Sequence, residues 1–158
     1  MSWFRARSVF AIAVGLLLLG MGAVGCSSNA NNPYLDLGPT PTATTQTFTG
    51  TLDNSGDVPI LRLTHTFTTT YDGTVTITLT ANAPDASLLI GFGIGVWDST
   101  ASTCGPLLSW NNTATPGTII LGNAVAGNFC VQVYDVGNLA AGAQTNYTVE
   151  VTHYKALG

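Results

Sequence analysis

The chain has 158 residues, of which 46% are hydrophobic and only 8% are charged, and its formal net charge at pH 7 is −4. This length fits one domain of ordinary size. Two of the four basic residues, Arg5 and Arg7, lie at the very start, so the rest of the chain is strongly acidic. It therefore lacks the basic surface that binding to nucleic acid or to anionic lipid requires.

The N-terminus has the pattern of a secretory signal. Arg5 and Arg7 precede an uninterrupted apolar run, Val9 to Gly25, that ends in small residues. The run has 17 residues, which is the lower limit for a helix that spans a bilayer and disfavours an uncleaved transmembrane helix. Residues 1–25 are therefore predicted to be a signal peptide.

A cysteine follows directly after this segment. The residues Ala23 to Cys26, AVGC, resemble the bacterial lipobox, in which cleavage occurs before a lipidated cysteine, although Ala23 stands where leucine is most common. The resemblance implies that Cys26 is lipidated and that acyl chains anchor the protein to the membrane. Ser27 resembles the residue that allows transport to the outer membrane in a host with two membranes. The predicted location is the cell envelope, on the periplasmic face of the outer membrane or at the cell surface.

The chain that would start at Cys26 divides into two parts. Residues 26–45 are dominated by Pro, Thr, Asn and Ser and have too few apolar side chains to offset the entropy of ordering, so we expect a flexible tether. In residues 46–155, clusters of turn residues separate eight short runs rich in Val, Ile, Thr, Tyr and Phe, with no helical pattern. This organisation predicts a single all-β domain, a sandwich or a barrel.

Alternation along the runs indicates which side chains face the core. In Thr74 to Thr80, the even positions are threonines and the odd positions are apolar, so one face is buried and the other solvated. If this run pairs directly with the preceding one, parity requires a three-residue bulged loop and places Phe67 opposite Ile77. By the same parity, the side chains predicted to face inward are Leu61, Leu63, His65, Phe67, Phe129, Val131, Val133, Tyr147, Val149, Val151 and His153.

Two cysteines remain once Cys26 is assigned to lipid. Cys104 and Cys130 would lie in an oxidising compartment and are predicted to form a disulfide. Because Cys130 is on an outward position, the bridge would hold the loop after Trp97 against the outside of the domain and add about 3 to 4 kcal/mol of stability. A reactive or metal-binding pair is disfavoured by the spacing and by the lack of a nearby histidine.

Several segments resemble bacterial pre-peptidase C-terminal (PPC-like) domains. These domains have a strand of pattern G-x-[YF]-x-V-x-V followed by a loop and a final Y-T-V-x-V strand, as in GNFCVQV (127–133) and YTVEV (147–151). FTGTL (48–52) and the block HTFTTTYDGTVTITLTANAPDASLLIGFGIGVWD (65–98) add to the likeness. The resemblance implies a jelly-roll-like β-sandwich of about eight strands with a binding or accessory role. Some such domains bind calcium, and Asp53 and Asp57 are the candidate ligands, although a solvated turn is the preferred interpretation.

Three glycines alternate in the run SLLIGFGIGVWD. Leu88, Ile90, Phe92, Ile94 and Val96 are predicted to face the core, and Gly91, Gly93, Gly95 and Trp97 the other side. The glycines weaken a strand unless something requires them. Either aromatic rings of Trp97, Trp110 or Tyr134 cover the bare backbone, which is the favoured interpretation, or the glycines form a groove for an extended glycan or peptide, with Trp97 and Tyr134 as stacking platforms. A nucleotide site is excluded because G-x-G-x-G lacks the fingerprint spacing and no helix follows.

Nothing in the sequence indicates catalysis. Both histidines, His65 and His153, fall on apolar strand faces, where packing explains them, and G-x-S-x-G, H-E-x-x-H and a free nucleophilic cysteine are missing. No enzyme activity and no cofactor are expected. The sequence predicts a lipid-anchored envelope protein with a noncatalytic binding or structural module. The alternative is a surface adhesion module that binds a glycan or peptide, with calcium as a candidate ion.

Overall fold

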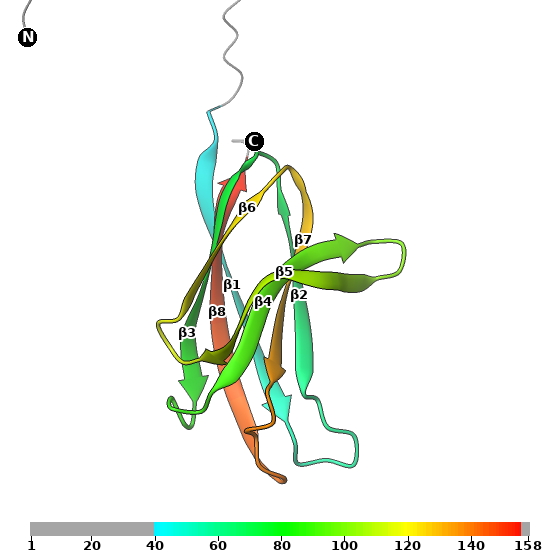
Figure 1. The fold of residues 1–158 in the computed structure, drawn as a ribbon, viewed down its shortest axis with the longest axis vertical. Helices are drawn as coiled ribbons and strands as arrows, with labels where there is room; N and C mark the ends of the chain where they lie inside the picture. Colours follow the sequence, from blue (N-terminus) through cyan, green and yellow to red (C-terminus); the bar gives the residue numbers. More distant parts are fainter. Residues whose placement is uncertain (1–39, 156–158) are drawn as a thin grey trace, which may run out of the picture. The chain divides into compact units, whose positions relative to one another are not determined.

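The computed structural model describes residues 40–155 as two antiparallel four-stranded sheets that form a β-sandwich (Figure 1). This confirms the predicted all-β sandwich of eight strands. The strands are β1 (Thr42–Asp53), β2 (Arg62–Thr69), β3 (Gly73–Ala83), β4 (Ile90–Asp98), β5 (Thr103–Ala114), β6 (Ile119–Ala124), β7 (Gly127–Asp135) and β8 (Gln144–Lys155). Within these residues no helix is long and apolar enough to cross a membrane.

The domain begins slightly earlier than the sequence indicates. β1 starts at Thr42, so β-structure extends four residues into the segment 26–45 that was predicted as a tether. The threonines there pair with the end of β8, from Thr42 opposite Lys155 to Thr45 opposite Thr152. Pairing with a long partner strand thus orders residues whose composition alone favours a flexible chain. The predicted signal peptide, Cys26 and residues 26–39 lie outside the described residues.

Strand pairing in both sheets is mainly between strands distant in sequence. One sheet has the order β1-β8-β3-β6 and the other the order β2-β7-β4-β5, so β4 and β5 are the only consecutive strands that pair among the eight described. β2 and β3 belong to different sheets, and Phe67 lies opposite Phe129 rather than Ile77. The condition for a bulged hairpin, direct pairing of these two runs, is therefore not met. Two strands that each have one apolar face can bury these faces in two ways. They can lie side by side in one sheet, or they can belong to different sheets that face each other across the core.

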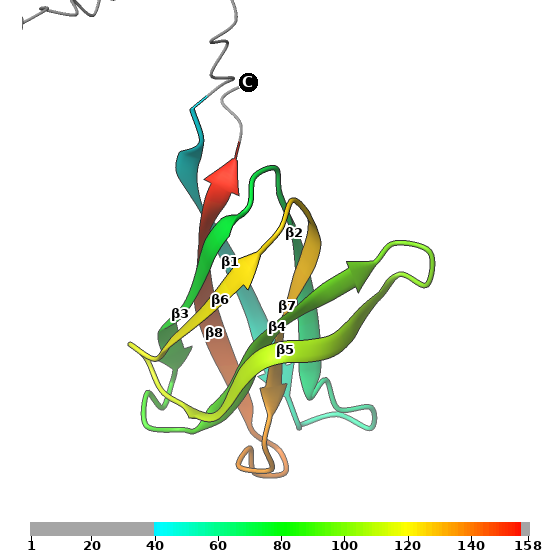
Figure 2. The ribbon, with the colours of Figure 1, turned by 45° about the horizontal axis from the view of Figure 1, so that its top comes forward.

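The core lies between the two sheets and contains the apolar positions that alternation predicts. Its largest fully buried side chains include Tyr147, Phe92 and Ile77. Thr76 and Thr78 on the opposite face of β3 remain partly exposed. Val96 is an exception because its side chain is 50% exposed. It lies near the end of β4, where the β4–β5 hairpin extends sideways beyond the body of the sandwich in both views (Figure 2).

Candidate ligand groove

A groove of about 600 Å³ is formed by outward-facing side chains of the sheet β2-β7-β4-β5. Arg62 of β2 and Gln132 and Tyr134 of β7 form one side. They alternate with inward-facing residues such as Leu63 and Val133, which places them on the outer face. The edge strand β5 forms the other side. The complete lining is Arg62, Cys104, Gly105, Pro106, Leu107, Trp110, Asn112, Gln132 and Tyr134.

β5 reaches into the groove because its pairing with β4 is irregular. The register shifts at three places, between Ile90 and Phe92, between Ile94 and Gly95, and between Gly95 and Trp97. Each shift leaves an extra residue in β5, as in a β-bulge, which bends a strand and changes the direction of its side chains. Leu107 and Trp110 can therefore both face the groove, opposite Gly95 and Gly93, although they are three residues apart and simple alternation along β5 would place them on different faces.

The three glycines of β4 lie beneath this groove and are buried. A Cβ atom on Gly91 would overlap the ring of Tyr134, and one on Gly93 would lie 2.7 Å from the Ser109 carbonyl oxygen and 2.8 Å from the Trp110 Cβ. On Gly95 it would lie 3.1 Å from the Cys104 Sγ. Side chains therefore cover the glycine backbone, as the favoured interpretation predicted. The alternative, in which the bare glycines form a groove for an extended ligand, is wrong.

The covering residues differ partly from those expected. Tyr134 and Trp110 approach the glycines as the sequence predicted, and the disulfide and Leu107 complete the cover. Trp97, which the sequence offers as a covering ring and in the alternative interpretation as a stacking platform, does not line the groove. It is half-buried and pairs with Cys104 near the hairpin. The accessible surface thus consists of side chains above the glycines rather than the glycine backbone itself.

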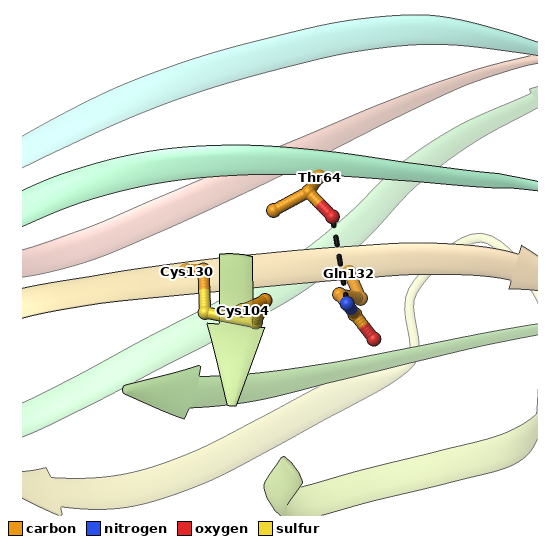
Figure 3. Close-up of a disulfide and its surroundings, with 4 residues drawn as sticks. All are labelled: Thr64, Cys104, Cys130 and Gln132. Atoms are coloured by element: carbon orange, nitrogen blue, oxygen red, sulfur yellow. Dashed lines mark hydrogen bonds between the residues drawn. A yellow bond between two sulfur atoms is a disulfide. The ribbon is translucent and has the colours of Figure 1, made fainter. Parts of the chain in front are cut away.

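The predicted disulfide between Cys104 and Cys130 is present, with the two Cα atoms 5.8 Å apart. Cys104 lies in strand β5 rather than in a loop, so the prediction of a loop staple is wrong in this respect. The bridge connects β5 to β7 across the intervening strand β4, where Gly95 pairs with Cys130. The missing side chain of Gly95 leaves room for the bridge to cross. Figure 3 shows this disulfide near Gln132, whose Nε2 donates to the Thr64 Oγ1 at 3.5 Å.

Arg62, Tyr134 and Asn112 form a connected set across the groove. The Arg62 guanidinium carbon lies 5.4 Å from the centroid of the Tyr134 ring, in cation–π geometry. The Tyr134 hydroxyl donates a hydrogen bond of 2.6 Å to the Asn112 Oδ1. Burial raises the pKa of Tyr134, against a smaller lowering by the Arg62 charge, so the hydroxyl remains a donor at neutral pH. These contacts fix the Tyr134 ring over β4.

The carboxylate of Asp53, one of the two candidate calcium ligands, is already engaged in hydrogen bonds. The Asp53 Oδ1 accepts a hydrogen bond of 2.7 Å from the Ser55 backbone N–H, and its Oδ2 accepts one of 2.8 Å from the Gln144 Nε2. Hydrogen bonds from Ser55 lower the pKa of Asp53. Asp57 is exposed, and residues 40–155 contain no cluster of three or more His, Cys, Asp or Glu side chains that could hold a metal ion.

Neither histidine lines the groove. The His65 Nε2 is hydrogen-bonded to the Tyr147 hydroxyl at 2.8 Å, and its ring stacks on Phe48 with centroids 5.0 Å apart. His153 is fully buried, and its ring lies 5.3 Å from that of Phe67. Both side chains therefore pack in the sandwich interior, as their positions on apolar faces indicated.

Comparison with known proteins finds similar chains among solved structures. No protein-family model and no curated protein matches the chain. Among solved structures, the pre-peptidase C-terminal domain of a collagenase from Bacillus anthracis is similar, with 15% sequence identity and a TM-score of 0.46 over 70% of this chain and 89% of that one. This likeness carries no conclusion about function. The fold and the site define an antiparallel β-sandwich with a groove on the outer face of one sheet.

Proposed function

We propose that this is a lipid-anchored protein of the cell envelope whose β-sandwich is a noncatalytic binding module, with the groove as its ligand site. The observation that carries the proposal is the groove itself. Its volume of about 600 Å³ lies in the range of ligand pockets. Its lining combines one exposed aromatic ring, that of Trp110, with the polar groups of Arg62, Asn112 and Gln132.

The chemistry of the lining supports binding rather than catalysis. Cys104 is in a disulfide, and the Tyr134 hydroxyl is held as a hydrogen-bond donor to Asn112. Nucleophilic or general acid–base catalysis needs a nucleophile and a base within hydrogen-bond distance of each other. The groove has no such pair, since both histidines of the chain lie elsewhere.

The position of the groove suits a protein held by its N-terminus. The chain enters the domain at Thr42, which pairs with Lys155 at one end of the sandwich. β1 ends at Asp53, which forms a bridge with Ile60 just before Arg62, so Arg62 lies towards the opposite end (Figure 1). A chain attached through Cys26 would thus enter the domain at the end opposite Arg62 and leave the Arg62 end of the groove uncovered.

Adhesion to a glycan or a peptide is the second candidate and uses the same groove. A calcium ion in such an adhesion module has less support, because the Asp53 carboxylate is already hydrogen-bonded to Ser55 and Gln144. A binding module for the envelope itself and an adhesion module for another surface differ only in where the ligand resides.

Removal of the Trp110 ring tests the binding proposal. Trp110→Ala should lower binding to immobilised envelope polysaccharides or peptides by about tenfold, because an exposed aromatic ring is typically a dominant contact in a ligand site. Leu121→Ala is the matched control, since Leu121 is 64% exposed on β6 of the other sheet. Unchanged binding by Trp110→Ala across glycans and peptides would remove the groove from the function.

The anchor is tested separately. A Cys26→Ala form should move from the membrane fraction to the soluble fraction, because two or three acyl chains are needed for permanent attachment. Cys104→Ala is the control that removes a cysteine without affecting lipid attachment. If Cys26→Ala remains in the membrane fraction, the proposed lipid anchor is wrong.

A further inference from the structure

Arg62 has no carboxylate partner among residues 40–155, although this part of the chain is acidic. From residue 40 to residue 155 the chain has two basic residues, Arg62 and Lys155, against seven acidic ones. Arg62 is exposed, and its interaction within the described domain is the contact with the Tyr134 ring, without a carboxylate partner. The nearest carboxylate along β7, that of Asp135, instead accepts hydrogen bonds of 2.9 and 3.0 Å from the backbone N–H groups of Asn138 and Leu139.

The contact with Tyr134 leaves the edge of the guanidinium available. Arginine has five N–H donors in a planar fork, and cation–π contact uses the face of the group rather than these donors. A fork of this kind binds a carboxylate through two parallel hydrogen bonds. At physiological salt the screening length is about 8 Å, so the more distant acidic residues weaken such a contact little.

Over β7 and β4, the groove offers side chains rather than backbone to a ligand. It lies over β7 and β4, which are the two inner strands of the sheet order β2-β7-β4-β5. Their backbone groups are paired on both sides, so a peptide that lies over these two strands cannot bind by adding a strand, the mode in which main-chain hydrogen bonds supply affinity. A ligand must be recognised through rings, amides and charge, which favours a saccharide over an extended peptide.

Trp110 and the amides suit a sugar ring. The Trp110 side chain is 57% exposed and lies in the same groove as Arg62. An aromatic face provides a flat apolar surface with a polar edge, which matches the C–H face of a pyranose. The Asn112 Oδ1 is occupied by Tyr134, which leaves the Asn112 amide nitrogen to donate to a hydroxyl.

We propose that the groove binds an anionic saccharide that carries a carboxylate, of the uronic acid type, with the carboxylate on Arg62 and a sugar ring on Trp110. This inference rests on the proposed binding function and adds the chemical class of the ligand. Charge complementarity favours an acidic saccharide over a neutral one. A neutral glycan would contact Trp110 and the amides but would leave the Arg62 guanidinium without a partner.

The test compares a carboxylate with its own neutral form. Oligogalacturonate and its fully methyl-esterified counterpart share ring and linkage, and calorimetric titration measures the affinity of each, with a glucuronate-containing oligomer as a second acidic probe. We expect the wild-type domain to prefer an acid over its neutral counterpart by about tenfold or more, the value of a charge-assisted hydrogen bond. Arg62→Gln should remove this preference and Arg62→Lys should retain part of it.

Two controls separate the possible failures. Lys155→Gln removes the same charge from β8 of the other sheet and should leave the preference unchanged. Equal affinity for acid and ester, a preference that survives Arg62→Gln, or no binding of either acidic probe would overturn the anionic ligand. If Trp110→Ala then still reduces binding of neutral glycans or peptides, the proposed binding function stands and only the anionic class of ligand is wrong.

Discussion

The ring of Tyr134 occupies the space above Gly91 that any other residue would fill with its side chain. Tyr134 is held there from both sides, by the Arg62 guanidinium and by its hydrogen bond to Asn112. The glycine in β4 and the aromatic ring in the neighbouring strand β7 are therefore one structural unit. This unit forms part of the groove wall and links the stability of the sheet to the shape of the ligand site.

Substitution of Gly91 should destabilise the domain through this contact. Gly91→Ala forces the Tyr134 ring to move, and overpacking of this kind costs about 1 to 3 kcal/mol. Gly56→Ala is the matched control, because a Cβ there would lie 3.9 Å from the nearest atom. Chemical denaturation of both variants measures the difference. If Gly91→Ala is as stable as Gly56→Ala, the ring is not fixed as described.

Removal of the disulfide should lower the stability of the oxidised protein. Cys104 and Cys130 are separated by 26 residues, and closing a loop of that length stabilises a fold by about 3.5 kcal/mol in the chain-entropy model. Unfolding of the double variant Cys104→Ala with Cys130→Ala, compared with the wild type under oxidising conditions, measures this loss. Under reducing conditions the two proteins should differ much less, and an equal difference in both would contradict the role of the bridge.

His65 should make stability depend on pH. Burial lowers the pKa of His65 from its ordinary value of 6.5, so the unfolded chain binds the proton first as pH falls. The contribution of His65 to the free energy of unfolding is therefore fully present above pH 6.5. It is lost as pH falls from 6.5 through the lower pKa of His65 in the folded state. Denaturation midpoints measured between pH 7.5 and pH 5 should follow this course.

The variant His65→Phe isolates this effect. It keeps an aromatic ring next to Phe48 but cannot be protonated, so the decline below pH 6.5 should become shallower. It also removes the hydrogen bond to the Tyr147 hydroxyl, which lowers stability equally at all pH values. An unchanged pH profile would show that another group causes the decline.

His153 should be replaceable by an apolar residue. Its side chain is fully buried, and its Nε2 has no hydrogen-bond partner among the described residues. A buried polar atom without a partner costs about 1 to 3 kcal/mol, which an apolar side chain of similar volume avoids. His153→Leu should therefore unfold at the same or a higher temperature. A clear loss of melting temperature would indicate a partner for this nitrogen, such as a buried water molecule.

Alternation in the sequence was sufficient to predict which face of most strands is buried. Positions such as Val75, Ile77 and Leu79 are buried as expected, because a strand places successive side chains on opposite faces whatever its partner is. The same local rule assigned Cys130 to an outer face, and elimination then paired it with Cys104. These conclusions depend on nearest neighbours along the chain and do not require the topology.

Only the tertiary structure decided which strands are neighbours and what covers the glycines. Parity is equally satisfied when β2 and β3 pair or when they face each other across the core, so the pairing of Phe67 with Phe129 could not be deduced. The register shifts in β5 break the alternation on which prediction depends, and they bring Leu107 and Trp110, three residues apart, to the same side of the sheet in the groove. The candidate site is thus a product of long-range pairing and strand irregularity, which a local pattern does not encode.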